Sequence, residues 1–91
     1  MIKIIKLSSG DELITQLKTT SKKGNEVVSH TATHPFIINH LDEGQIGFEP
    51  YCAYAVEGEI TIRPEHVVWT AIPETGLETQ YKDLIINIPK D

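Results

Sequence analysis

Closely spaced turns divide the chain, and this spacing limits what it can fold into. Clusters of Gly, Ser, Asn and Asp separate short runs of apolar, often β-branched residues over the first two thirds of the sequence. Short strands joined by turns at such intervals are typical of a small barrel or sandwich. The sequence therefore predicts a mainly β fold, a small twisted barrel of five strands over about residues 1–72.

Several apolar runs are irregular, and the irregularities predict where the sheet bends. The alternation in Ile2–Leu7 changes face midway, as at a bulge or a barrel corner. Pro35 interrupts the run 27–39 and marks an edge, a bulge or a strand break, because proline cannot donate a ladder hydrogen bond. Apolar residues of 46–56 share one parity, broken by Pro50, and the mostly apolar run 66–72 predicts a strand buried on both faces.

The period changes after Pro73, where the sequence predicts a C-terminal α-helix over about residues 75–86. Thr75 followed by Glu78 fits a capping box, with Thr75 as the N-cap residue and Glu78 reaching back to it. The apolar residues of this segment fall on one helical face: Leu77, Tyr81, Leu84, Ile85 and Ile88. We expect this face to plug an end of the barrel or to cover one side of the sheet.

The 91 residues are predicted to form a single domain, residues 1–91. A domain this small buries only about 60–65% of its unfolded surface, so it is marginally stable and would gain from self-association. No apolar run approaches the ~20 residues of a membrane span, and Met1 leads into a strand without a signal-peptide pattern. The single cysteine, Cys52, makes no internal disulfide. These features predict a cytoplasmic protein with no membrane partner.

Motifs for catalysis and metal binding are few. The sequence has no phosphate-binding glycine loop, no nucleophile elbow and no paired-cysteine metal spacing, so we predict no enzyme, no cofactor and no metal site. His30, His34 and His40 share strand parity and, with Cys52, offer zinc-ligand chemistry. Pro35 interrupts that strand and the second cysteine is missing, so surface or half-buried histidines are favoured. A metal or small-ligand binder that uses His30 and His34 stays an alternative.

Charge is unevenly distributed along the chain, whose formal net charge is −5. Residues 1–30 carry five lysines and three acids, whereas residues 31–91 carry three basic residues and ten acids. The overall acidity opposes non-specific binding to nucleic acid, because attraction to phosphate supplies most of that affinity. A basic patch in the N-terminal third can still bind, particularly where several subunits pool their lysines.

Three segments carry a resemblance to a known family. Leu7–Leu13 (LSSGDEL) resembles the first motif of Sm-like proteins, and Ser21–Asn25 (SKKGN) resembles the RNA-binding loop that follows strand two of that motif. Ile62–Val68 (IRPEHVV) resembles the second Sm motif, a short turn that opens on an arginine. The wider pattern, Lys-Leu-x-x-Gly-Asp-Glu-Leu-Ile early and Glu-x-Gln-Tyr late, is similar to a group of small marine cyanophage proteins associated with the Sm-like fold.

The resemblance implies that the five-stranded sheet is strongly bent and closed into an open barrel of the Sm-like, SH3-like type. It also implies a ring-forming protein that binds single-stranded RNA and acts in RNA or DNA processing, in the host cytoplasm if a phage encodes it. Sm-like subunits pair edge strands with their neighbours, and we favour a pentamer, with a hexamer or heptamer as alternatives. The two pore-lining loops of the family nominate Lys22, Lys23 and Asn25, then Arg63, with His66 as an addition. Asparagine can hydrogen-bond a base edge, and arginine can stack on a base or pair with phosphate.

Three positions differ from the family motif, and they support an alternative function. Ser21 stands in place of aspartate, Gly24 in place of a bulky apolar residue that helps to hold the base, and Pro64 in place of glycine. Together with the net acidity, these differences favour, as the alternative, a non-enzymatic phage structural or protein-interaction module that binds no nucleic acid. In that interpretation Lys22 and Lys23 form a solvated hairpin tip and His66 faces solvent.

Overall fold

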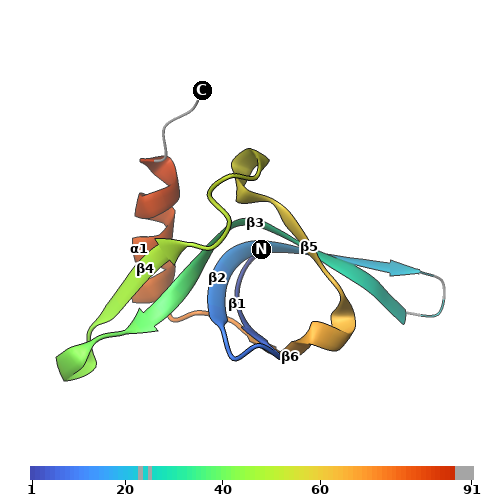
Figure 1. Ribbon diagram of the computed structural model, residues 1–91, viewed down its shortest axis with the longest axis horizontal. Coiled ribbons are helices and arrows are strands. Elements are labelled where there is room, and N and C mark those ends of the chain that lie inside the picture. The colour runs from blue at the N-terminus through green and yellow to red at the C-terminus, as the bar shows by residue number, and fades with distance from the viewer. Residues whose placement is uncertain (23, 25, 88–91) are drawn as a thin grey trace.

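The strands form one antiparallel sheet whose order differs from their order along the chain (Figure 1). The computed structural model describes residues 1–22, 24 and 26–87. Its elements are β1 (Ile2–Leu7), β2 (Glu12–Lys22), β3 (Glu26–His40), η1 (Asp42–Gly44), β4 (Ile46–Pro50), η2 (Val56–Gly58), β5 (Ile60–Ile62), η3 (Pro64–His66), β6 (Val67–Ala71) and α1 (Thr75–Ile86). The order across the sheet is β4-β3-β2-β1-β6, and β5 pairs with β3. The predicted mainly β fold with a C-terminal helix is confirmed, with six strands where the sequence predicts five.

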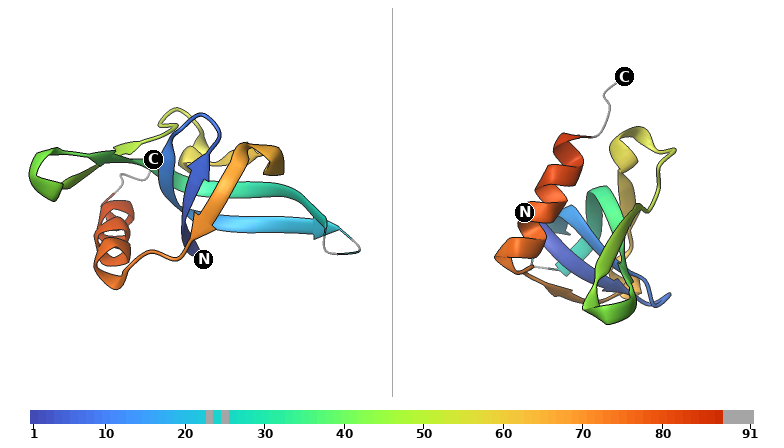
Figure 2. Two further views of the ribbon diagram at one scale, coloured as in Figure 1. Left: turned by 90° about the horizontal axis from the view of Figure 1, so that it is seen from below. Right: turned by 90° about the vertical axis from the view of Figure 1, so that its left-hand side faces the viewer.

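The long strand β3 gives the sheet its curvature. Along one edge it pairs with β2 over nearly its whole length, while its other edge pairs with two different strands. The second half of β3 bonds to β4 through Phe36–His40, and the first half bonds to β5 through His30–Ala32. The sheet bends between these two halves, so that β5 lies across the inner core from β1 and β2, while β6 lies beside β1 as its ladder partner (Figures 1 and 2).

Both faces of the sheet are apolar, and each face has its own core. Neighbouring residues of one strand point to opposite sides, so Leu13 faces the inside of the curled sheet and Ile14 faces the helix. The buried residues of the inner core are Ile5, Leu7, Leu13, Ala32 and Ile62. Those of the helix-side core are Ile14, Phe36, Ile38 and Tyr81. Each large apolar side chain buried in this way contributes about 1.5–3 kcal/mol.

The bend is a β-bulge in β3 at His34 and Pro35. The register places Ile14 opposite Phe36 and Gln16 opposite Thr33, so that two residues of β3 oppose the single residue Thr15. His34 takes a φ of 50°, a left-handed backbone conformation that is costly for a residue with a side chain. The predicted disruption at Pro35 is therefore a bulge. The predicted change of face in Ile2–Leu7 is wrong: β1 alternates regularly, with Ile5 and Leu7 in one core and Ile2 and Ile4 against the other, and the register shift opposite Lys6 and Leu7 places its extra residue, Val68, in β6.

The carbonyl groups that the bulge frees from the ladder all find donors. The fully buried Thr15 donates its hydroxyl to the Thr33 carbonyl at 2.8 Å. The hydroxyl of Tyr81, which is fully buried on α1, donates to the carbonyls of Thr33 at 3.2 Å and His34 at 2.7 Å. The Pro35 carbonyl accepts a hydrogen bond from the backbone N–H of Tyr51 at 2.9 Å. The helix is thus fixed to the bend by hydrogen bonds as well as by apolar packing.

One predicted strand ends at its predicted break, and one prediction about burial is wrong. The shared parity of residues 46–56 does not continue as a strand, because β4 ends at Pro50, where the sequence indicates a break, and the backbone of Tyr51 turns back to the bulge. The loop beyond it leaves Tyr54 and Val56 exposed. The run 66–72 is not buried on both faces, because β6 is the last strand of the order and pairs with β1 alone among the described strands.

The helix occupies the predicted span, but it begins without the predicted capping box. Its N-cap residue is Glu74, no side chain caps the helix start, and the backbone N–H of Glu78 bonds to the Glu74 carbonyl. Four of the five residues of the predicted apolar face, Leu77, Tyr81, Leu84 and Ile85, pack against the sheet. The fifth, Ile88, lies outside the described residues.

The Tyr81 hydroxyl predicts a loss of stability at alkaline pH. Burial raises the pKa of the Tyr81 phenol from 10.0 to about 12. The unfolded chain loses this proton near pH 10 while the folded chain retains it. Stability should therefore be unaffected by this group below pH 10 and fall by about 2–3 kcal/mol as the pH rises to 12.

Urea unfolding of the wild type and Tyr81→Phe between pH 7 and pH 12 measures this effect. At neutral pH the variant should be about 1–3 kcal/mol less stable, because the Thr33 and His34 carbonyls lose a buried donor. Its alkaline loss should be smaller than that of the wild type. Equal alkaline losses in the two proteins would contradict the assignment.

Candidate nucleic-acid interface

The β2–β3 hairpin extends beyond the rest of the sheet as a two-stranded arm, residues 18–30 (Figures 1 and 2). Strand β5 pairs with β3 only at His30–Ala32, so residues 26–29 of the arm have β2 as their described ladder partner. Lys18 is exposed on the arm, and Lys22 is the last residue of β2, paired with Glu26 through the backbone. Only the backbone of Lys22 is described, and Lys23 and Asn25 lie outside the described residues.

The turn between β5 and β6 carries the other two predicted residues. Arg63 directly precedes η3, its side chain is 80% exposed, and its Nη1 lies 3.9 Å from Oε1 of Glu65. An exposed ion pair of this length contributes little, so the guanidinium is accessible to a ligand. His66 ends η3, and its backbone N–H bonds to the Arg63 carbonyl at 3.0 Å.

The β1–β2 turn holds η3 in place. The backbone N–H of Ser8 donates to the His66 carbonyl at 2.8 Å, and the Ser8 hydroxyl lies 3.2 Å from Nδ1 of His66. In the same turn Gly10 takes a φ of 99°, which glycine adopts without strain. The carboxylate of Asp11 accepts the Ser9 hydroxyl at 3.0 Å and the Tyr51 hydroxyl at 3.4 Å. Both predicted Sm motifs thus meet at this turn.

The surroundings of Tyr51, Asp11 among them, change the pKa of its phenol. Burial, and then the negative charge and hydrogen bond of Asp11, raise the pKa of the Tyr51 phenol above its ordinary value. The phenol therefore stays a donor to Asp11 at neutral pH. It ties the loop after β4 to the turn that supports His66.

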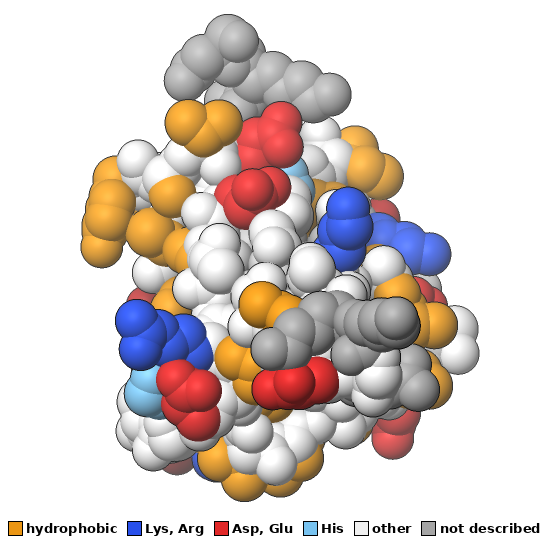
Figure 3. Space-filling model, turned by 90° about the vertical axis from the view of Figure 1, so that its right-hand side faces the viewer, with side chains coloured by type: hydrophobic (Ala, Val, Ile, Leu, Met, Phe, Trp, Pro, Cys, Tyr) orange, Lys and Arg blue, Asp and Glu red, His pale blue; other side chains and the backbone are white. Residues whose placement is uncertain are grey.

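Arg63 lies on the arm side of the molecule. Ile62 pairs with His30, and β5 runs antiparallel to β3, so Arg63 follows one residue closer to the tip of the arm. Figure 3 views the molecule from this side. The described Lys and Arg side chains gather there in two separate groups, with acidic side chains beside and between them. The described side chains on this face therefore form no single basic pocket.

The histidines are engaged in separate contacts. Nδ1 of His30 lies 3.0 Å from the Thr19 hydroxyl, and Nε2 of His40 lies 2.9 Å from Oε1 of Glu12. His34, in the bulge, lines a cleft of about 390 Å³ with Gln16, Thr33, Glu57, Ile85 and Ile86. Over residues 1–22, 24 and 26–87, no three His, Cys, Asp or Glu side chains are grouped as metal ligands would be. Cys52 is half-buried.

Strand β6 has exposed apolar residues that the sequence analysis assigned to the interior. The exposed fraction is 61% for Val68 and 42% for Trp69, and Ile72 beyond the strand is also exposed. The composition of the run gives no sign of this exposure, because the same residues would suit a central strand. Only the position of β6 at the end of the sheet order reveals it.

No protein-family model matches the sequence, and no curated protein matches it significantly. The Sm-like identity therefore stays a prediction from the motifs at 7–13, 21–25 and 62–68. In the part of the chain that the structure describes, no helix is long and apolar enough to cross a membrane.

The exposure of Arg63 and His66 predicts that their side chains can be removed without loss of fold. Arg63→Ala and His66→Ala should each change the free energy of unfolding by about 0.5 kcal/mol or less, because neither side chain is buried. Urea unfolding followed by circular dichroism measures this. A larger loss would mean that the turn supports the fold, and the two variants would then be unsuitable as probes of ligand binding.

Proposed function

We propose that the protein is a non-enzymatic, ring-forming protein that binds single-stranded RNA and acts in RNA or DNA processing in the cytoplasm. The observation that supports this most is the pairing of Ile62 with His30, which sets Arg63 on the same side of the molecule as the arm. The segment 62–68 thereby begins beside the base of the arm, whose two strands continue outward from His30 to Lys22 and Glu26.

The proposed RNA-binding residues are of two kinds, cations that attract phosphate and side chains that contact bases. Lys22, Lys23 and Arg63 attract phosphate, the amide of Asn25 bonds a base edge, and His66 offers a ring for stacking or hydrogen bonding. One acidic subunit would bind RNA weakly, because its net charge is −5. A ring repeats the three cations around one axis and so concentrates positive potential despite that acidity.

The exposed edge of β6 supports the proposed assembly. Edge strands with exposed backbone and apolar side chains invite pairing with another chain, and Val68, Trp69 and Ile72 line this edge. In the proposed ring, the β6 edge of one subunit pairs with the β5 edge of its neighbour. A pentamer is favoured, with a hexamer or heptamer as alternatives, and pairing would add stability to a small domain.

One alternative function is supported by a separate observation. Acidic side chains accompany the described cations on the arm side of the molecule, and Glu65 lies beside Arg63. A structural or protein-interaction module of a phage, which assembles without binding nucleic acid, would have such a surface.

The RNA proposal predicts a salt-dependent affinity that the three cations control. In anisotropy titrations with uridine-rich and adenine-rich oligonucleotides, Lys22→Ala/Lys23→Ala/Arg63→Ala should bind more weakly than the wild type. If each cation meets one phosphate, the slope of log affinity against log salt should decrease by roughly 2. Lys82→Ala, which removes one exposed lysine of α1, is the control and should bind like the wild type. Equal binding by the wild type and the triple variant would refute the RNA proposal and favour the structural module.

The ring proposal predicts the mass of the assembly. Light scattering should give about 51 kDa, five copies of the 10.2 kDa chain, or the corresponding value for six or seven copies. Val68→Lys places a charge on the exposed edge and should shift the protein to a smaller species without unfolding it. Trp69 is the only tryptophan, so its fluorescence reports burial of this edge directly. A wild type that stays monomeric, with unshifted Trp69 emission, would exclude the ring and its pore.

A further inference from the structure

Two hairpins protrude from opposite ends of the molecule (Figures 1 and 2). The longest extent of the chain is 43 Å, with the arm at one end and the β3–β4 hairpin at the other. We refer to residues 41–46, the connection from β3 to β4 together with the first residue of β4, as the acidic tip. The arm and the acidic tip are therefore too far apart to contact each other within one copy.

The acidic tip combines apolar and acidic side chains, and all of its residues are exposed. Leu41 is 52% exposed, and Ile46 is also exposed. Asp42 and Glu43 lie between them, and residues 41–50 contain no lysine or arginine. The acidic tip thus presents two partly exposed apolar side chains beside two carboxylates.

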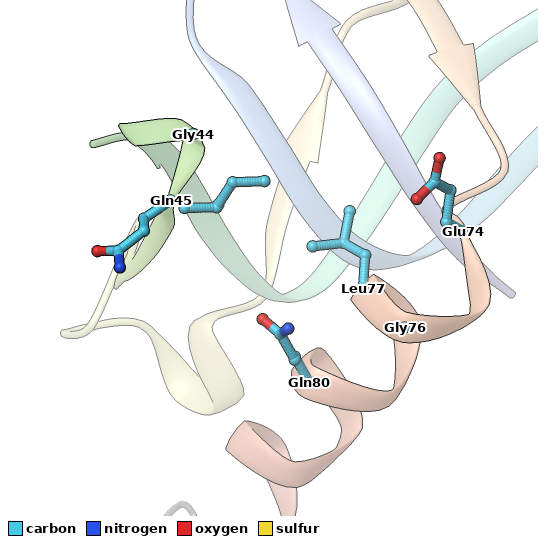
Figure 4. A pocket seen from close by; sticks show the side chains of 7 residues that line it. Gly44, Gln45, Glu74, Gly76, Leu77 and Gln80 are labelled. Atoms are coloured by element: carbon cyan, nitrogen blue, oxygen red, sulfur yellow. The ribbon is translucent and has the colours of Figure 1, made fainter. Parts of the chain in front are cut away.

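A cleft adjoins the acidic tip and separates it from the start of α1. It has a volume of about 520 Å³, and Ile46 and Leu77 supply its apolar wall while Gln80 and Glu74 supply polar groups. Figure 4 shows Leu77 and Gln80 rising from the helix toward the hairpin. The acidic tip and this cleft form one continuous acceptor surface.

The arm has the complementary composition. Val27 and Val28 are exposed, the latter by 49%, although they lie in a strand. Residues 18–30 contain three lysines, Lys18, Lys22 and Lys23, against one acid. A two-stranded ribbon without further layers is only marginally stable in water, so the arm would gain from a surface that covers it.

We propose that the arm of one copy docks on the acidic tip and the adjoining cleft of a second copy. An exposed valine of the arm would contact Ile46 and Leu77, and the lysines would face Asp42, Glu43 and Glu74. The occupant is a second copy because this chain itself carries both complementary surfaces at separate ends. The contact joins different surfaces, so each added copy leaves a free arm and a free acidic tip, and the assembly is a closed ring or an open chain.

This contact is distinct from the edge pairing proposed above, because it uses neither β5 nor β6. The test is therefore made in the Val68→Lys background, which removes edge pairing, and with protein freed of nucleic acid by nuclease and high salt. The arm variant carries Lys18→Glu, Lys22→Glu and Lys23→Glu. The tip variant carries Asp42→Lys, Glu43→Lys and Glu74→Lys.

Sedimentation velocity at low salt follows self-association of each protein and of their mixture. Each variant alone should associate about tenfold or more weakly than the Val68→Lys parent, because like charges then oppose each other at the contact. Mixed together, the two variants should co-assemble in equal numbers, because the basic surfaces of the tip variant, arm and tip, each face an acidic surface of the arm variant. A chain that carries all six substitutions should recover the association of the parent.

Lys82→Glu in the same background is the matched control, because it reverses an exposed charge on α1 outside both surfaces and should leave association unchanged. Circular dichroism of each variant establishes that the fold is kept. Folded variants whose mixture associates no more strongly than either variant alone would overturn the docking proposal. That result would leave the edge-paired ring intact, since its own test is the assembly mass of the wild type against Val68→Lys.

Discussion

The hydrogen bonds from Tyr81 to the bulge in β3 are the constraint on which the rest of the fold depends. A strand of fifteen residues cannot bend at His34 and Pro35 without releasing carbonyl groups from its ladder. The cost of burying such groups without donors would exceed the gain from one more core side chain. Tyr81 removes that cost while its ring fills the helix-side core against Phe36, edge-on, with 6.0 Å between ring centroids. One side chain therefore fixes the helix to the sheet and offsets the free-energy cost of the carbonyl groups that the bend releases.

The bend also determines where the functional surfaces lie. Because the two halves of β3 diverge at the bulge, its first half carries β5 and the arm, and its second half carries β4 and the acidic tip. Arg63 is adjacent to the arm only because β5 pairs with the first half. The same divergence puts basic and acidic hairpins at opposite ends of the molecule. A change that straightened β3 would therefore disturb the proposed RNA contacts and the proposed docking contact together.

Features that depend on local sequence could be predicted, and features that depend on partners far along the chain could not. Pro35 indicated an edge, a bulge or a strand break because its missing N–H acts locally, and the apolar spacing of α1 indicated which face is buried. The partner of the Tyr81 hydroxyl is 47 residues away, and nothing near Tyr81 in the sequence specifies it. Likewise, the exposure of Trp69 follows from the end position of β6 in the sheet order, which a run of apolar residues does not encode. The candidate site shows the same division, since the motif residues could be nominated but their distribution over separate elements could not.

The charge of the chain links the two proposed interactions and makes them compete. Lys22 and Lys23 would face phosphate in an RNA complex and carboxylates of a second copy in the docked assembly. The two arrangements use the same cations, so binding of one ligand opposes binding of the other. In these two proposals the acidic tip of a second copy competes with nucleic acid for the basic arm. This competition would oppose indiscriminate binding of nucleic acid. RNA would have to displace that contact, and only a strand that also engages Arg63 and Asn25 gains enough additional contacts to do so.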